Sequence, residues 1–452
     1  MKALPLALLF LAPLLRADDT IILDEAPLLC RCFSHIFDIP AIDDSDLILP
    51  ERVVQKEDNA YFLIEQLAKE SLTQAERKEL AELLNAQEWD QNQARALFTK
   101  HYDLQIAPLL RISLLDGYQE MRAETLIDDI PKNIVQIRVS TQLLTLAHRY
   151  YRHDNQPEKG DEILRSFSHA SELLLENQGT LVSALIAQAI YQTYLKELAW
   201  ASLQRNVTLE RARLYPELIP QINYQKTFVE SPLKEEYRTL VNLCDLVATG
   251  RLIGGNLLNQ MAGNPAPVDE KSEVLGRYFT AISLAQKNRT RAASSAFTRS
   301  LLARSKLNHQ QLAKLEPLAK PFPNHPWQVF HVNLIGKLLM KLSHPTQESY
   351  LSRIFLIETH EKLTRIALVL RAYQLEHEGA LPETLAALSP RYLAQIPLDP
   401  YVDKPFHYDP ARKRLWSVGS DHESEGGLSP EALAKARMRD LEREPTIDLS
   451  LK

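Results

Sequence analysis

The chain contains few glycines and few cysteines for its length. Its 452 residues include 13 glycines and 3 cysteines, whereas 45% of them are hydrophobic. A turn-rich β protein uses more glycine, so this composition favours long helices. Cys30 and Cys32 stand too close together for an ordinary disulfide, and Cys244 falls inside a helical pattern. The sequence therefore predicts unpaired or buried thiols instead of a disulfide framework.

An excess of positive charge is also missing. The 52 Lys and Arg residues are outnumbered by 58 Asp and Glu residues, which gives a formal net charge of −6. Proteins that bind nucleic acid concentrate positive charge on one face or along one run of residues. We therefore predict no nucleic-acid partner.

No linear motif identifies a reaction. His360 and His377 are each followed by glutamate but lack the second histidine of a zinc-protease helix. His325 and His331 stand close together, and a core or capping role is favoured over a catalytic one. The leading hypothesis is a binding or scaffold protein without catalytic activity. The alternative is an envelope hydrolase whose active site lies between helices, for which a titratable pocket around His325 and His331 would be the sign.

The first residues have the layout of a secretory signal peptide. Met1 and Lys2 precede an apolar run from Ala3 to Leu15, and a small residue, Ala17, follows Arg16. The run is shorter than the roughly 20 apolar residues that a spanning helix needs. No later stretch is long and apolar enough to cross a bilayer. We predict a bacterial protein that is periplasmic or extracellular, without a transmembrane segment after cleavage.

Helical periodicity dominates the middle of the chain. Apolar residues recur at three to four residue spacing from Ile134 to His153, and a second helical pattern runs from Gly160 to Gln178. The stretch from Leu181 to Ala201 is apolar on nearly every side, so we predict that it is the buried central helix. Two further helices are expected, from Trp327 to about Leu342 and from Gln347 to His377.

These patterns divide the chain into six segments. After the signal peptide we predict an irregular segment, a helical body, a proline-rich crossing, a region of long helices with a C-terminal module, and a polar tail that frays after Pro445. Their residue ranges are 1–17, 18–58, 59–310, 311–326, 327–427 and 428–452.

The C-terminal module has a mixed pattern. Leu363, Ile366 and Leu370 fall on one face of a helix that Gly379 ends. Two short strands are then expected, one from Pro405 to Tyr408 and one from Leu415 to Val418, joined by a turn. The predicted fold class is mostly α: a multi-helix body of helical hairpins, with a small C-terminal α+β module of one long helix and a short antiparallel sheet.

Three motifs follow one another between about residues 364 and 427. The first is a helix end with Leu370, Tyr373, Gly379 and Pro382. The second is an Asp-Pro turn with its strand, made of Asp399, Pro400, Pro405, Phe406 and Tyr408. The third is a glycine-rich loop with Ser417, Gly419, Asp421, Gly426 and Gly427. In this order they resemble the soluble region of the major pseudopilins of type II secretion. The membrane helix and cleavage site of that family are missing, so assembly into a pseudopilus is not expected.

The resemblance implies a place and a role. Signal peptide, helical body and tail together look like a group of secreted bacterial proteins, a comparison that brings no activity with it. We expect the pseudopilin-like tail to act as an interaction element toward envelope proteins.

The resemblance also implies a calcium site in the final loop. Pseudopilins bind calcium in this region, and the likeness transfers Asp421. Glu423 and Glu425 add carboxylates at alternate positions, and calcium prefers several oxygen ligands in a flexible loop. The other interpretation is a solvated acidic loop, since His422 replaces the glycine of the family. The sequence therefore predicts an optional calcium ion held by Asp421, Glu423 and Glu425.

Overall fold

The computed structural model describes residues 38–86, 88–120, 133–248, 286–318, 333–435 and 442–451. This part of the chain is mostly helical, with small antiparallel sheets near the C-terminus, which confirms the predicted fold class. The predicted signal peptide, Cys30 and Cys32, and the pair His325 and His331 lie outside the described residues.

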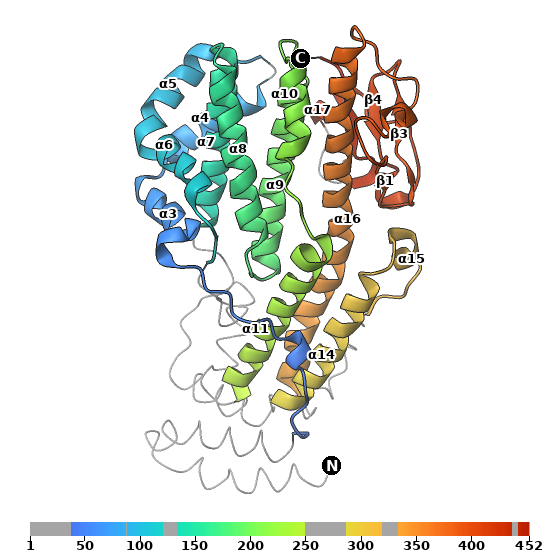
Figure 1. Ribbon diagram of the computed structural model, residues 1–452. Coiled ribbons are helices and arrows are strands. Elements are labelled where there is room, and N and C mark those ends of the chain that lie inside the picture. Colours follow the sequence, from blue (N-terminus) through green and yellow to red (C-terminus); the bar gives the residue numbers. More distant parts are fainter. Residues whose placement is uncertain are drawn as a thin grey trace, which may run out of the picture.

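Short helices form the outer layer of the body, at the left of Figure 1. Their starts are fixed locally: Thr73 and Glu76 form a capping box, and Asp90 accepts hydrogen bonds from two amides of the first turn that follows it. The helices of this layer are α3 (Ala60–Leu67), α4 (Gln74–Asn85), α5 (Gln91–His101) and α6 (Ala107–Leu110). They pack on α7 (Ile134–His153), directly or through neighbouring turns.

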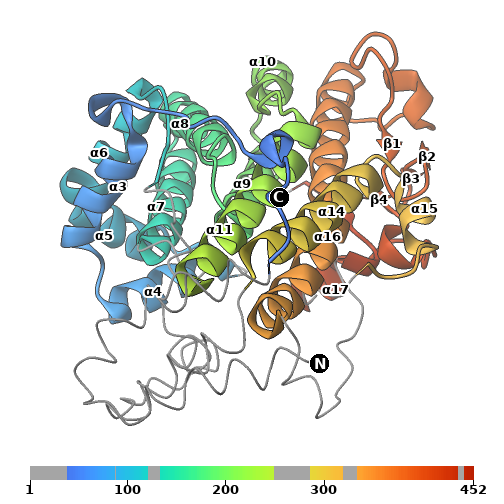
Figure 2. The ribbon, with the colours of Figure 1, turned by 90° about the horizontal axis from the view of Figure 1, so that it is seen from below.

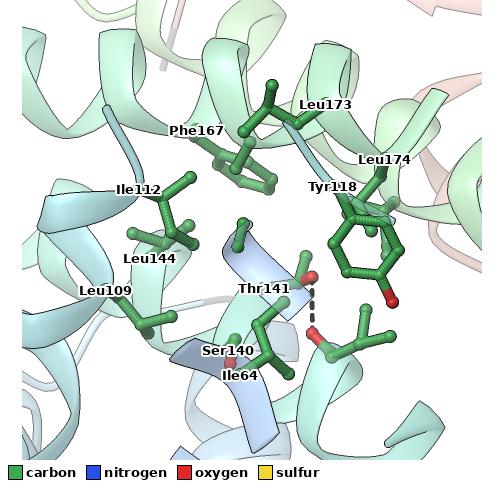
Figure 3. A pocket seen from close by; sticks show the side chains of 14 residues that line it. Ile64, Leu109, Ile112, Tyr118, Ser140, Thr141, Leu144, Phe167, Leu173 and Leu174 are labelled. Atoms are coloured by element: carbon green, nitrogen blue, oxygen red, sulfur yellow. Dashed lines mark hydrogen bonds between the residues drawn. The ribbon is translucent and has the colours of Figure 1, made fainter. Parts of the chain in front are cut away.

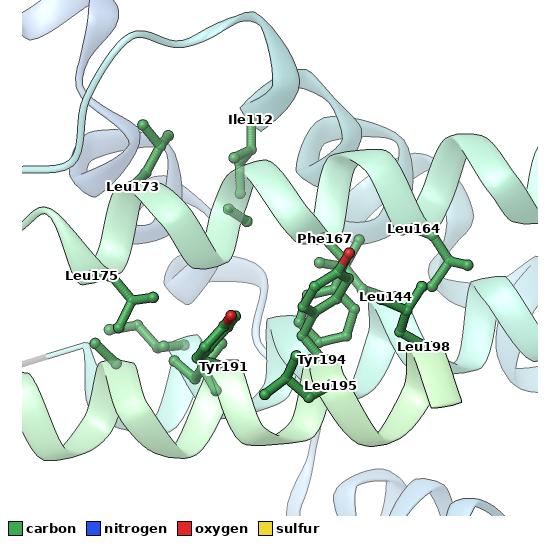
Figure 4. Close-up of a cluster of buried hydrophobic side chains, with 14 of the residues drawn as sticks. Ile112, Leu144, Leu164, Phe167, Leu173, Leu175, Tyr191, Tyr194, Leu195 and Leu198 are labelled. Atoms are coloured by element: carbon green, nitrogen blue, oxygen red, sulfur yellow. The ribbon is translucent and has the colours of Figure 1, made fainter. Parts of the chain in front are cut away.

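Three long helices make the centre of the body. α7 packs on α8 (Pro157–Leu175), and α8 packs on α9 (Leu181–Ser202). The predicted central helix is confirmed as α9, whose Tyr191 and Tyr194 side chains are fully buried. Tyr194 meets Phe167 of α8 with ring centroids 5.3 Å apart, in the apolar cluster of Figure 4. Aromatic rings at helical spacing thus fill the core of the body.

A second group of helices lies below this centre (Figures 1 and 2). It consists of α11 (Ser231–Ala248) and α14 (Lys287–Arg304), which pack on each other and on the long helix described next. α10 (Leu209–Leu214) also packs on that long helix, and α15 (His309–Ala313) follows α14 in the chain. The segment before the body crosses this group, because Asp44 accepts hydrogen bonds from Arg291 of α14 at 2.8 and 3.0 Å. Cys244 of α11 is a buried free thiol, as expected, and burial raises its pKa to about 12.

The sequence predicted two helices where the structure has one. A single helix, α16 (Leu334–Glu376), continues through Pro345. Packing on both sides of the proline explains this result. His344 stacks on Phe297 of α14 with ring centroids 3.6 Å apart, and the hydroxyl of buried Tyr350 accepts a 2.8 Å hydrogen bond from Gln188 of α9. Proline has no backbone N–H, so Pro345 removes one hydrogen bond from the helix, and these contacts offset the cost of that loss.

The C-terminal module follows α16. Gly379, with φ of +90°, takes up the left-handed conformation after the helix end. The chain then forms β1 (Leu398–Asp399), β2 (Lys404–Pro405), β3 (His407–Asp409) and β4 (Arg414–Trp416). β1 pairs with β2, and β3 pairs with β4 in an antiparallel register that places Tyr408 opposite Leu415. The predicted hairpin is confirmed.

The expectation of a fraying C-terminus was wrong. After α17 (Pro430–Lys435), a fifth strand, β5 (Thr446–Asp448), pairs with β4 and completes a three-stranded antiparallel sheet in the order β3-β4-β5. Leu449 is 3% exposed and belongs to the module core. Hydrogen bonds to β4 and the burial of Leu449 hold the tail, and neither is visible in the local composition.

Two hydrophobic cores meet at α16. Residues on one side of the helix join the body core: Tyr350, Leu351, Ile354, Ile357, Leu368 and Ala372. Others join the module core: Leu363, Ile366, Ala367, Val369 and Leu370. The helix stands between the body and the strands in Figure 1. The module is therefore fixed to the body by a helix that each of them needs for its own core.

Candidate functional site

Asp399 ties the Asp-Pro turn to the final loop of the module. Its side chain is buried, with Oδ1 accepting from the Tyr401 amide at 3.0 Å and Oδ2 from the Val418 amide at 3.1 Å. Burial raises the pKa of this carboxyl despite the hydrogen bonds. The sequence marked the turn and the loop as separate motifs, and the structure brings them together through this one side chain.

The predicted calcium ligands lie in the final loop, where an arginine already meets two of them. Arg443 places Nε 2.9 Å from Asp421 Oδ2 and Nη2 3.3 Å from Glu425 Oε1. Glu423 is exposed, and its amide donates to Asp421 Oδ1 at 3.2 Å. Burial disfavours the charged form of Asp421, but the hydrogen bonds from Arg443 and from the Glu423 amide outweigh it and lower its pKa.

This arrangement does not fit a calcium ion as it stands. Calcium takes six to eight oxygen ligands, and within the described residues no three acidic, histidine or cysteine side chains converge on a common point. An ion in this loop would have to displace the guanidinium of Arg443 from Asp421 and Glu425. Calcium binding by these residues stays a prediction.

His422 of the same loop meets a histidine from a distant part of the chain. Its Nε2 lies 2.7 Å from Nδ1 of His309, the first residue of α15. His309 is buried, with the rings of Phe355 and Tyr401 against it at centroid distances of 5.0 and 4.7 Å. Burial, and then the neighbouring His422, lower the pKa of His309 to about 4. Sequence reasoning missed this pair, because no local pattern relates two residues so far apart.

A buried ionic group lies between α7 and α9. Glu197 accepts from Arg149 Nε at 3.1 Å and Nη2 at 2.8 Å, and its Oε1 lies 2.6 Å from His148 Nδ1. Burial acts against the charge of Glu197, but Arg149 and His148 outweigh it and lower its pKa to about 2. The sequence carries a signal for this group, since Glu197 stands between Leu195 and Leu198 in an apolar helix. A charge buried in such a helix needs partners that form ion pairs or hydrogen bonds with it.

The contact of Glu197 with His148 resembles part of a hydrolytic triad, in which a carboxylate orients a histidine. His148, however, has no exposed surface, and its ring lies against Trp200 at 5.6 Å between centroids. A general base must reach the proton that it removes. The geometry therefore indicates that Glu197 holds Arg149 and His148 of α7 inside the body, with a structural role.

The cavity in Figure 3 lies inside the body, among residues of α3, α6, α7, α8 and α9. Its volume is about 20 Å³, which is room for one water molecule. Its walls are mainly aliphatic and aromatic, and the Thr141 hydroxyl among them donates to the Ile137 carbonyl at 2.9 Å. This space is a packing defect of the core and has no polar groups arranged for a ligand.

Comparison of the chain with models of protein families, with curated proteins and with solved structures gives no match. Among the helices of the described segments, none combines the length and the apolar character required to cross a membrane.

Proposed function

We propose that this protein is a secreted scaffold or binding protein of the bacterial envelope, in which the helical body presents the C-terminal α+β module to an envelope partner. The observation that carries the proposal is the shared helix α16. Leu363, Ile366 and Leu370 support the module core, whereas Ile357 and Leu368 support the body core. A binding element on a rigid helix loses little conformational freedom on association, which favours affinity.

The module also has an exposed strand pair. Leu398 of β1 is 44% exposed, and Lys404 and Pro405 of the paired strand β2 are exposed as well. An exposed leucine among charged residues is a suitable contact for a protein surface. The resemblance of the module to pseudopilins supports a partner in the envelope.

The test uses the full chain, because removal of residues from 364 onward would also take Leu368 and Ala372 out of the body core. Wild type and a Leu398→Glu, Lys404→Glu variant are used to capture partners from an envelope extract. The control is Leu104→Glu, which changes a leucine of the body that is 56% exposed.

Loss of a defined partner with the module variant, and its retention with Leu104→Glu, would support the proposal. Identical partner sets from all three proteins would overturn the role of the module. Circular dichroism of each variant establishes that the fold is intact.

A further inference from the structure

An acidic segment of the chain lies across helices α11 and α14 (Figures 1 and 2). This segment, residues 38–47, is called the strap below; it is rich in aspartate and has no basic residue. Of its side chains only Asp44 and Leu47 are buried. The strap therefore docks through two anchors three positions apart, which the short turn Ser45–Leu47 presents to the helices.

Two arginines of α14 hold the strap by paired hydrogen bonds. Arg291 donates from Nε and Nη2 to the two carboxylate oxygens of Asp44, at 2.8 and 3.0 Å. Arg299 binds Asp46 in the same way, at 3.0 and 2.6 Å. Paired bonds between arginine and a carboxylate fix the direction of the ligand as well as its charge. Burial acts against the charge of Asp44, but hydrogen bonds from Arg291 and Tyr237 outweigh it and lower its pKa.

Leu47 supplies the apolar contact of the strap. Its side chain has no exposed surface and packs against Tyr237 and Val241 of α11, with Leu302 of α14 beside them. The hydroxyl of Tyr237 also donates a hydrogen bond to Asp44. One tyrosine thus contacts both anchors, so the surface recognises an acid and a leucine at a fixed spacing.

The backbone of the strap is not joined to the helices that it covers. Among the described residues, the strap shares no backbone–backbone hydrogen bond with α11 or α14, and residues 48–51 share none with the body. The next fixed point is Arg52, whose amide donates to Gln178 at 3.2 Å. A segment that is held by its side chains alone can be replaced by another peptide with the same side chains.

We propose that the surface formed by Tyr237, Val241, Arg291, Arg299 and Leu302 binds acidic peptide segments of other proteins with the pattern Asp-x-Asp-Leu, and that the strap occupies it in the free protein. The two arginines take the two acids, and the side chains of α11 take the leucine. A tethered strap competes with a free peptide at an effective concentration in the millimolar range. The surface lies outside the C-terminal module, so the inference does not depend on the function proposed above.

Fluorescence anisotropy of a labelled peptide of residues 38–48 measures binding to the full chain. The strap variant carries Asp44→Asn and Leu47→Ser, which remove both buried anchors, and Asp46→Asn is a milder second variant at an exposed ion pair. Arg291→Gln is then added to each of them. Its control is Arg289→Gln, at an exposed position of the same helix that meets the strap through its backbone amide. Circular dichroism establishes that each variant is folded.

The strap variant should bind the peptide at least about tenfold more tightly than wild type, because only the fraction of wild type with an open strap can bind it. Asp46→Asn should lie between the two. Arg291→Gln should weaken binding at least about tenfold, since it removes hydrogen bonds between charged groups, and Arg289→Gln should leave it nearly unchanged.

Three results would overturn the proposal. They are equal affinity of wild type and both strap variants, an effect of Arg291→Gln no larger than that of Arg289→Gln, and no binding of millimolar peptide to either strap variant.

Discussion

The hydroxyl of Tyr191 in α9 donates a 2.8 Å hydrogen bond to the Glu361 carboxylate in α16. Tyr224 donates to the same oxygen, and Arg365 reaches the other at 3.2 Å. Burial and the charge of Glu361 raise the pKa of Tyr191, so its hydroxyl stays a donor at any physiological pH. This group joins the central helix of the body to the helix that carries the module.

Replacement of Tyr191 by phenylalanine removes one donor from the buried carboxylate while the ring remains. We expect a loss of about 1.5–3 kcal/mol in the free energy of unfolding, the usual cost for a hydrogen bond to a charged group. Urea denaturation measures it. Tyr150→Phe, on a partly exposed ring of α7 that stacks on Phe98, is the control and should cost less than about 0.5 kcal/mol. If both substitutions lowered the free energy of unfolding equally, the hydrogen bond from Tyr191 to Glu361 would not stabilise the fold.

The ionic group of Glu197 should be sensitive to both mutation and pH. Glu197→Gln leaves Arg149 and His148 without their anion, and removal of one partner of a buried ion pair costs about 3–5 kcal/mol. The pKa of Glu197 is lowered from 4.5 to about 2, so the stability that its charge contributes is complete above pH 4.5 and falls as pH decreases toward 2.

Denaturation of wild type and Glu197→Gln at several pH values measures this effect. The stability difference between them should be constant above pH 5 and should narrow below pH 4.5. Glu82→Gln, in an exposed pair with Lys78 at 3.7 Å, provides the control, with an expected change below about 0.5 kcal/mol. A difference independent of pH down to 3 would contradict the ionic role.

The C-terminal strand should contribute to the stability of the module. Leu449→Ala removes a buried side chain next to β5, for which about 2–5 kcal/mol is the usual cost. Ser450→Ala, at a partly exposed neighbour, should be close to neutral. Thermal or urea unfolding compares the two. If Leu449→Ala were as mild as its control, the tail would fray in solution as the sequence suggested.

Calcium and Arg443 should compete for the final loop. Arg443→Gln releases Asp421 and Glu425 from the guanidinium, so calcium should raise the melting temperature of this variant more than that of wild type. A ligand at about 100 times its dissociation constant adds about 2.7 kcal/mol. Thermal unfolding in excess EGTA and in excess calcium measures the shift, and Asp421→Ala should abolish it. Without a shift in either Arg443→Gln or wild type, the loop would be an ion pair with Arg443 and no calcium site.

Local patterns were enough for the elements that depend on near neighbours. The helix Ile134–His153 has the bounds that its periodicity predicts, and the predicted central helix begins at Leu181 as expected. The hairpin of β3 and β4 also follows from alternating residues and a turn. At Pro345 the local rule failed, because contacts of His344 and Tyr350 with other helices decide whether α16 continues.

The composition and periodicity of this chain determined that it is a helical protein with a small C-terminal sheet. Few glycines and apolar residues at three to four residue spacing indicate helices, and alternating residues around a turn indicate the strands. Only the tertiary structure decided which side chains meet: His309 with His422, Glu197 with Arg149, Asp421 with Arg443. All three pairs join separate segments of the chain, and each places charge or hydrogen bonds where packing brings the partners together. Sequence spacing carries no record of such contacts, since they arise from the packing of elements that lie far apart along the chain.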